Sequence, residues 1–471
     1  MAQDSAGGLP DFALPDFVVA DLPPPPASTW KIIGPGVVAA GVGLASGEFI
    51  LFPYIASQVG LVFVWAALVG LVTQFFINME VERYTLATGE TVLTGFSRLG
   101  RHWGLFFAVL AIVANLWPGW MMSSATLVTF IAGGGNPRTI AIGMLIAMGL
   151  ILTLSPVVYR ALERTQFLKV AAVLMLIVVA GLFAVPGTLW GEAPGLIAQV
   201  DIPAETLGWP LLMGALAYAG AGGGQNLCQS NWIRDKGFGM GKHAPRIVSP
   251  LTGEPVAAPG TGWRFECGEE NLAVWKRWWR FANTEQLVTF VAISFLTILF
   301  MSLLAYATLN GRAGLTNGIG FLKIESEVLS ASVGGWFGTL FLVVGAFSLF
   351  AAALGIVDYS ARLAADVLRT SYLKASNESV LYAALVWGII LTGIAILSSG
   401  LDQPIVLLVV AGCIAAFMMF LYSILLIRVS RLLAPELRPA PYRVAMLCWA
   451  VLLFGALTAM TAYDQIGKLI G

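Results

Sequence analysis

Two glycine-rich segments interrupt long apolar stretches of the chain. The first runs from Gly43 to Glu48 and the second from Gly220 to Asn226, and each lies inside a stretch long enough to cross a bilayer. A helix broken at membrane depth exposes N–H and C=O groups that lipid cannot satisfy, so such breaks persist only where protein encloses them. Broken helices at corresponding places in two halves of a chain are typical of secondary transporters. The pair therefore predicts a substrate site between the breaks.

The composition indicates a polytopic membrane protein. Of the 471 residues, 58% are hydrophobic and 11% are charged, and the mean hydropathy is +0.83, which excludes an ordinary soluble domain. The net charge of zero gives no sign of a nucleic-acid partner. Eleven apolar spans of about 20 residues are predicted. They start near Ile32, Leu61, Gly104, Thr139, Phe167, Leu207, Glu285, Trp336, Val380, Pro404 and Val444.

The distribution of lysine and arginine predicts the orientation. If the N-terminus is cytoplasmic, the external segments hold only Arg138, Arg312, Lys323 and Lys468, which leaves 22 of the 26 basic residues inside. This asymmetry follows the positive-inside rule. We therefore expect a multi-pass protein of the cell membrane with a cytoplasmic N-terminus and an external C-terminus.

The predicted organisation is a tail followed by one transporter domain. Residues 1–30 are acidic and proline-rich, as in a disordered cytoplasmic tail. Residues 31–471 form the transporter domain. Within it we expect a first repeat at 31–190, a second repeat at 207–430 that contains a cytoplasmic loop at 232–283, and an extra helix at 443–466.

The long cytoplasmic loop contains an amphipathic segment. Leu272, Trp275, Trp278, Trp279 and Ala282 recur at helical spacing opposite basic residues. Such a helix either lies on the inner membrane surface or packs against the cytoplasmic face of the transporter. The sequence leaves both alternatives open.

Cysteine and histidine usage argues against a resident metal or cofactor. Cys228, Cys267, Cys413 and Cys448 show no paired spacing, so neither a disulfide framework nor a zinc site is indicated. The chain has only two histidines. No nucleophile, base and orienting group can be placed together, so we expect no enzymatic activity and no cofactor.

The first span resembles that of the Nramp (natural resistance-associated macrophage protein) divalent metal transporters. The resemblance lies in the spacing of Gly34-Pro35-Gly36, Ala45-Ser46-Gly47-Glu48 and the segment from Gly60 to Trp65. Further matches are Arg83 with Thr88-Gly89-Glu90, the segment from Arg160 to Glu163, and Asn226-Leu227. The resemblance implies an all-α integral membrane protein with the LeuT-type fold of the APC superfamily. That fold has 11 transmembrane helices here, as a 5+5 inverted repeat with helices 1 and 6 unwound around an ion site.

The departures from the family pattern point to a changed ion site. The metal-binding Asp and Asn of the family correspond to Ala45 and Glu48, and its thioether ligand corresponds to Gly223. The acidic positions of its proton pathway fall on Asn115 and Pro118. We therefore expect that Mn²⁺ is not bound by the usual chemistry of the family, and that Gly223→Met with Ala45→Asp would raise the affinity for Mn²⁺.

The predicted substrate-binding residues come from both breaks. Glu48 is the one expected metal ligand, and with no basic residue expected beside it, its carboxylate could alternate between a cation and a proton. Cys228 and Asp358 could contact the site from behind, although Arg362 four residues after Asp358 favours a structural ion pair. The full set is Ala45, Glu48, Gly220, Gly223, Gln225 and Asn226.

The aromatic residues Trp117 and Trp120, which flank Pro118 in the third span, form either the wall of a cavity or an ordinary kinked helix. The sequence does not decide between the two.

Three functions compete. The sequence favours a secondary-active transporter of a hard cation such as Mg²⁺, coupled to protons or not, whose partners are the bilayer and a small cation. A transporter of a small organic cation or amino acid in the same fold is the second, and a non-transporting membrane sensor is the third. A monomer is compatible with the sequence.

Overall fold

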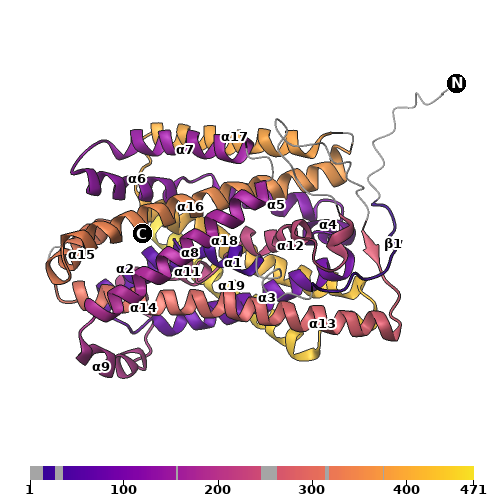
Figure 1. Ribbon diagram of the computed structural model, residues 1–471, viewed down its shortest axis with the longest axis horizontal. Coiled ribbons are helices and arrows are strands. Elements are labelled where there is room, and N and C mark those ends of the chain that lie inside the picture. The colour runs from indigo at the N-terminus through magenta and orange to yellow at the C-terminus, as the bar shows by residue number, and fades with distance from the viewer. Residues whose placement is uncertain are drawn as a thin grey trace.

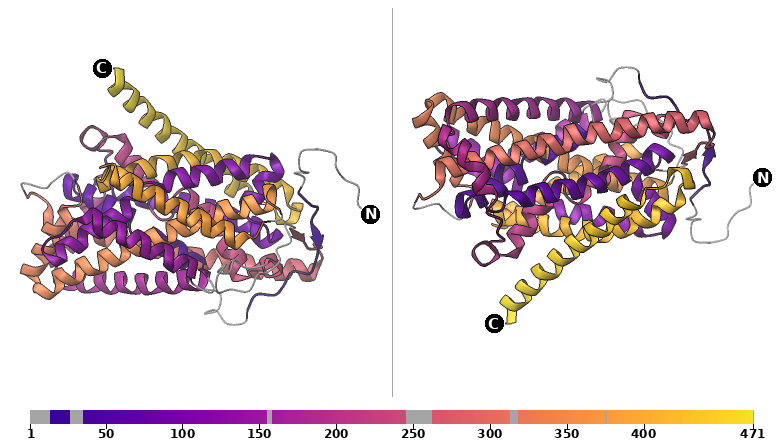
Figure 2. Two further views of the ribbon diagram at one scale, coloured as in Figure 1. Left: turned by 90° about the horizontal axis from the view of Figure 1, so that it is seen from above. Right: turned by 90° about the horizontal axis from the view of Figure 1, so that it is seen from below.

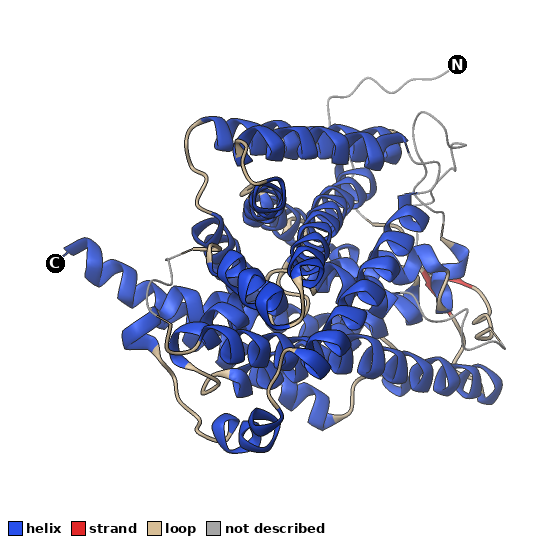
Figure 3. Ribbon diagram, turned by 60° about the vertical axis from the view of Figure 1, so that its left-hand side comes forward, coloured by secondary structure: helices blue, strands red, loops and turns tan. Residues whose placement is uncertain are grey.

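The computed structural model describes residues 14–26, 35–154, 158–244, 262–312, 318–374 and 376–470. These residues form an almost entirely helical bundle with one short pair of strands (Figure 3). Apolar side chains dominate the described chain, and the helix satisfies its own backbone groups, which makes it the structure that such a chain adopts in lipid.

The described residues of the first half of the chain form ten α-helices and one π-helical turn. They are α1 (Pro35–Gly43), η2 (Gly47–Leu51), α2 (Phe52–Val59), α3 (Val64–Thr88), α4 (Val92–Leu99), α5 (Trp103–Asn115), α6 (Gly119–Ala132), α7 (Pro137–Leu154), α8 (Val158–Phe183), α9 (Gly187–Ile197) and α10 (Ala204–Leu207).

The second half begins with another interrupted helix. Its helices are α11 (Trp209–Ala217), α12 (Gly224–Lys236), η3 (Gly239–His243), α13 (Glu269–Glu285), η4 (Gln286–Ala292), α14 (Ile293–Leu309), α15 (Phe321–Ser332), α16 (Gly335–Val367), η5 (Leu368–Tyr372), α17 (Glu378–Ser398), α18 (Pro404–Val429), η6 (Ser430–Leu432), η7 (Pro435–Leu437) and α19 (Pro441–Ile470).

Ten helices of the described chain are long and apolar enough to cross a membrane. The sequence predicted eleven spans. The sixth predicted span is not among the ten because it is divided into α11 and α12, each too short to cross alone.

The helices form an inner group and an outer layer (Figure 1). The pieces α5 and α6 pack with α7, α16 and α17 in the layer, where α7 and α17 lie side by side. The inner group consists of α1, α2, α3, α11, α12 and α14, with α8 and α18 flanking it. The last helix, α19, packs on α18 and α3, and its end projects from the bundle (Figure 2). Both broken helices therefore lie in the inner group.

Residues 14–26 do not form the disordered tail that the sequence predicted. Strand β1 (Val18–Val19) pairs in parallel with β2 (Trp263–Arg264). The Trp278 indole donates a hydrogen bond of 2.7 Å to the carbonyl of Pro23. Main-chain and indole contacts of this kind hold a proline-rich segment that has no apolar periodicity to reveal it. The rest of the predicted tail, residues 1–13 and 27–30, lies outside the described residues.

The amphipathic segment of the loop packs on protein. In α13, Trp275 and Trp278 are buried and Trp279 is half-buried, while Lys276 and Arg277 are exposed. The helix continues through η4 into α14 (Figure 1). The whole helix, Glu269–Leu309, has 41 residues, about twice the length that crossing a bilayer requires. Of the two alternatives for this segment, the structure has the second: its apolar face packs against the transporter.

A buried network of charges joins α12 to α16. The fully buried Arg362 donates hydrogen bonds of 3.1 and 2.9 Å to Asp358 and a further one to Asp235. Arg234 forms an ion pair with Asp366. The ion pair between Asp358 and Arg362 is the one favoured from the sequence, and here it belongs to a contact between two helices.

Candidate functional site

Helix 1 is interrupted where the sequence predicted. Helix α1 ends at Gly43, residues 44–46 form a turn, and η2 begins at Gly47. The second interruption runs from Tyr218 to Gly223, between α11 and α12. The predicted unwinding of the first and sixth transmembrane spans is thereby confirmed. Each break lies within two residues of its predicted position.

The two breaks touch each other through their backbones. A Cβ atom on Gly43 would lie 2.0 Å from the carbonyl oxygen of Gly220, and one on Gly47 would lie 1.9 Å from that of Tyr218. No side chain fits at these distances. The glycines of the first break are therefore required by the close approach of the second.

The glycines of the second break are required by their own conformation. Gly220, Gly222 and Gly223 have φ angles of 107°, 75° and 56°, in the region that L-residues rarely adopt. These angles turn the chain between α11 and α12. They also direct backbone N–H groups out of the helical pattern, where they need other partners.

Gln74 on α3 supplies those partners. Its amide nitrogen donates to the carbonyls of Ala217 and Ala219 at 2.9 and 3.0 Å. Its amide oxygen accepts from the N–H groups of Ala221 and Gly222, both at 2.9 Å. Sequence reasoning missed this residue, although a glutamine inside an apolar span is a usable signal. Gln74 holds the second break in its unwound form.

Replacing Gln74 with leucine is expected to lower the melting temperature of the protein in detergent. Four buried backbone groups would lose their partner, at about 1–3 kcal/mol each. Thermal unfolding followed by tryptophan fluorescence measures the effect. Gln199→Leu at an exposed loop position is the control. An unchanged melting temperature for Gln74→Leu would show that the break does not depend on this side chain.

Glu48, directly after the first break, is the one carboxylate in the segments 43–48 and 218–223. Its side chain is fully buried, and neither carboxylate oxygen accepts a hydrogen bond from the described residues. The backbone N–H groups of Glu48 itself, Gly220 and Ala45 lie near enough to stabilise the carboxylate electrostatically, without completing a hydrogen bond to it. Ala45 is also fully buried. A buried carboxylate without a partner is costly, which makes it a candidate binding group.

Lys169 on α8 lies within electrostatic range of Glu48. Its fully buried ammonium group donates a hydrogen bond to the carbonyl of Gly41 in α1. The expectation that no basic residue lies beside Glu48 is therefore wrong. From the sequence, Lys169 counts as a cytoplasmic charge because it stands at the start of an apolar span. In the structure it is buried against the first break.

The two predicted amides join helices to each other. The Gln225 side chain donates to the carbonyl of Ala39 in α1 at 2.5 Å. The Asn226 side chain donates to Asn78 on α3 at 2.7 Å, and its oxygen accepts from the hydroxyl of Tyr422 at 3.0 Å. In this structure both amides tie α12 to its neighbours. The oxygen of Asn226 is therefore less available to a cation than the carboxylate of Glu48.

Gly223 cannot be converted to the missing thioether ligand. Besides its φ of 56°, a Cβ atom there would lie 2.7 Å from the Cβ of Ala415 on α18. Gly223→Met would therefore be strained, because its side chain would be forced against α18, and the expected rise in Mn²⁺ affinity for Gly223→Met with Ala45→Asp stays a prediction. Alignment with the family pattern identified the position but not its backbone conformation.

The two residues predicted behind the site have separate roles. Asp358 binds Arg362 in the network described above. Cys228 is a free, fully buried thiol on α12, within electrostatic range of the same pair. Cys228 on α12 therefore faces the charge network to which Asp358 on α16 belongs.

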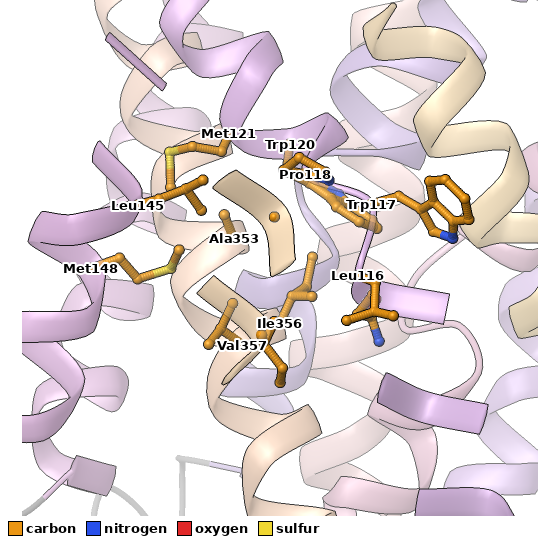
Figure 4. A pocket seen from close by; sticks show the side chains of 13 residues that line it. Leu116, Trp117, Pro118, Trp120, Met121, Leu145, Met148, Ala353, Ile356 and Val357 are labelled. Atoms are coloured by element: carbon orange, nitrogen blue, oxygen red, sulfur yellow. The ribbon is translucent and has the colours of Figure 1, made fainter. Parts of the chain in front are cut away.

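A third break lies in the third span. Helix α5 ends at Asn115 and α6 begins at Gly119, with Pro118 between them. Trp117, Pro118 and Trp120 line a cavity of about 20 Å³ (Figure 4), the size of about one water molecule. The indole nitrogens of both tryptophans are buried without a partner. The open question from the sequence is answered: the aromatic cluster forms a cavity wall, and the helix is broken.

The described residues offer few side chains that could bind a metal ion. They contain no cluster of three or more His, Cys, Asp or Glu side chains. A cation at the breaks would therefore rely on Glu48 and on carbonyl oxygens. Such a ligand set suits hard cations.

Comparison with known proteins shows the fold. No family model matches the sequence, and no curated protein matches it. Two variants of the Eremococcus coleocola manganese transporter superpose with a TM-score of 0.69 at 13% and 12% identity, covering 98% of this chain and 92% of theirs. MhsT in complex with L-phenylalanine gives a TM-score of 0.54 at 13% identity, covering 93% and 98%. The chain is therefore a multi-pass membrane protein with the LeuT-type fold that the manganese transporter structures share.

Proposed function

We propose that the protein is a secondary transporter that moves a metal cation by alternating access, with the cation held between the two breaks at Glu48. The observation that carries the proposal is the fully buried carboxylate without a hydrogen-bond partner at the contact of two broken helices. In transporter folds, discontinuous helices enclose the substrate site. The structural similarity to a manganese transporter supports the same class of substrate.

The donor atoms favour a hard cation. Glu48 offers a carboxylate, and the breaks offer carbonyl oxygens such as that of Gly220. The thioether of the family pattern is replaced by Gly223, whose Cβ position is occupied by α18. Oxygen ligands without sulfur or imidazole suit Mg²⁺ or a similar ion better than a dehydrated transition metal.

Lys169 gives this site a means of proton coupling. Without a cation, its ammonium supplies the positive charge that Glu48 needs. A cation at Glu48 places a second positive charge near Lys169, so cation binding and protonation of Lys169 oppose each other. The apparent cation affinity is therefore expected to rise with pH.

Uptake into proteoliposomes tests the proposal. The purified protein is reconstituted with a Mg²⁺-sensitive dye inside, and Mg²⁺, Mn²⁺ and choline are offered separately at several pH values. We expect saturable Mg²⁺ uptake above that of protein-free vesicles, with a lower half-saturating concentration at higher pH. Uptake of choline alone would replace the proposal by an organic-cation transporter. The absence of both uptake and cation-dependent thermal stabilisation would refute it.

A further inference from the structure

A second cavity lies away from the broken helices, next to the strands β1 and β2. Its volume is about 340 Å³, within the range of small-molecule sites, roughly 300–1,000 Å³. Four separate segments form its walls: Phe17 beside β1, the end of α3, strand β2 with the following residue, and the chain from η6 through η7. A ligand here would therefore bridge parts of the chain that are distant in sequence.

The charges around this cavity have one sign. Arg264, Arg431 and Arg438 line it, and no Asp or Glu is among its described lining residues. None of these arginines forms an ion pair within the described part of the chain. Like charges around one cavity repel each other, and an anion bound between them would offset this repulsion. The cavity thus has the electrostatics of an anion site.

Backbone contacts fix one of the three guanidinium groups in place. Arg438 donates hydrogen bonds to the carbonyls of Leu433 and Arg431 at 3.0 and 3.1 Å. Arg83 on α3 donates to the carbonyl of Leu437 at 3.0 Å, which attaches this part of the chain to the bundle. The η6–η7 segment is therefore held in shape before any ligand arrives, which lowers the cost of binding.

The remaining walls of the cavity are apolar. Phe17 and Phe265 line it together with Leu432, Leu433 and Leu437. The cavity also lies between the last turn of α18 and the start of α19, at the boundary where membrane helices end. Guanidinium groups bind phosphate oxygens in pairs of hydrogen bonds, and basic pockets beside membrane helices suit phospholipid headgroups.

We propose that this cavity binds a phosphate-bearing anion, with the phosphate held by Arg264, Arg431 and Arg438. A phospholipid headgroup and free inorganic phosphate share this chemistry. Bound there, the anion would hold the N-terminal segment, β2 and the η6–η7 segment together. The site is independent of the cation site at Glu48.

Thermal unfolding of the full-length protein in a non-ionic detergent tests the site. The probes are sodium phosphate, dihexanoyl phosphatidylglycerol and, as the zwitterionic comparison, dihexanoyl phosphatidylcholine, all at constant ionic strength and with lipids below their micellar concentration. We expect at least one anionic probe to raise the melting temperature saturably by about 2 °C or more. Phosphatidylcholine is expected to have a smaller effect.

The double variant Arg264→Gln/Arg431→Gln should raise the half-saturating concentration of the anionic probe about tenfold or more. Arg438 is left intact because it holds its own loop. The matched control is Arg277→Gln/Arg280→Gln, which removes the same charge from the exposed face of α13.

The anion that stabilises the parent identifies the source, either phosphate or the lipid headgroup. Stabilisation that persists unchanged in Arg264→Gln/Arg431→Gln would overturn the proposal, because a diffuse attraction to basic residues would then explain it. The absence of stabilisation by both anions would overturn it as well.

Discussion

Replacing Glu48 with glutamine is expected to abolish cation uptake. The carboxylate is the one acidic group of the two breaks, and glutamine keeps its shape while removing the charge. Removing one partner of a buried charge pair typically costs about 2–5 kcal/mol, and about 3 kcal/mol corresponds to roughly 100-fold in affinity. Uptake into proteoliposomes and cation-dependent thermal stabilisation both measure this loss.

A second substitution separates the loss of binding from a loss of folding. Glu48→Gln alone leaves Lys169 buried without its counter-charge, so the melting temperature should fall. Adding Lys169→Met removes that charge, and should restore the melting temperature without restoring uptake. Glu205→Gln, on the short helix α10, is the control for carboxylate removal elsewhere. Cation uptake by Glu48→Gln at the parental level would refute the role of this residue.

Replacing Gly47 with alanine is expected to prevent stable folding. The added Cβ would lie 1.9 Å from the carbonyl oxygen of Tyr218, which is backbone and cannot move aside as a flexible side chain can. Overpacking typically costs about 1–3 kcal/mol and sometimes more, and a contact this short with a backbone atom belongs to the upper end. Yield of monodisperse protein and the melting temperature report the effect.

Gly143→Ala on α7 is the matched control for that variant. A Cβ atom at Gly143 would have no atom within 4 Å, and alanine in a helix interior is favoured over glycine by about 1 kcal/mol. The control should therefore be as stable as the parent or slightly more stable. Equal stability of Gly47→Ala and Gly143→Ala would mean that the two breaks do not touch as described.

The sequence was sufficient for the fold because its strongest signals are local. Apolar spans predict membrane helices, and the glycine clusters at Gly43 to Gly47 and Gly220 to Gly224 predict the places where two of them unwind. Asp358 and Arg362 are one helical turn apart, so their ion pair was also open to prediction. Each of these inferences depends on residues close together along the chain.

The parts of the site that were missed depend on distant contacts. Lys169 on α8 is separated from Glu48 by the six helices α2 to α7, and the packing of α8 on α1 brings the two together. Gln74 reaches the second break across 147 residues. The strain expected for Gly223→Met has another cause, since a positive φ and a neighbour on α18 leave no mark in the sequence. These features follow from tertiary packing, which spacing alone does not encode.

The backbone contact between the breaks also constrains the timing of the proposed transport cycle. Gly43 and Gly47 lie against the carbonyls of the second break, so a rotation of α1 would displace the start of α12, and the reverse would also hold. Under the proposed function, we therefore expect access to change through one concerted reorientation of both half-helices, since two independent movements would drive these atoms into each other. A single kinetic phase would then govern how fast each side of the membrane is reached.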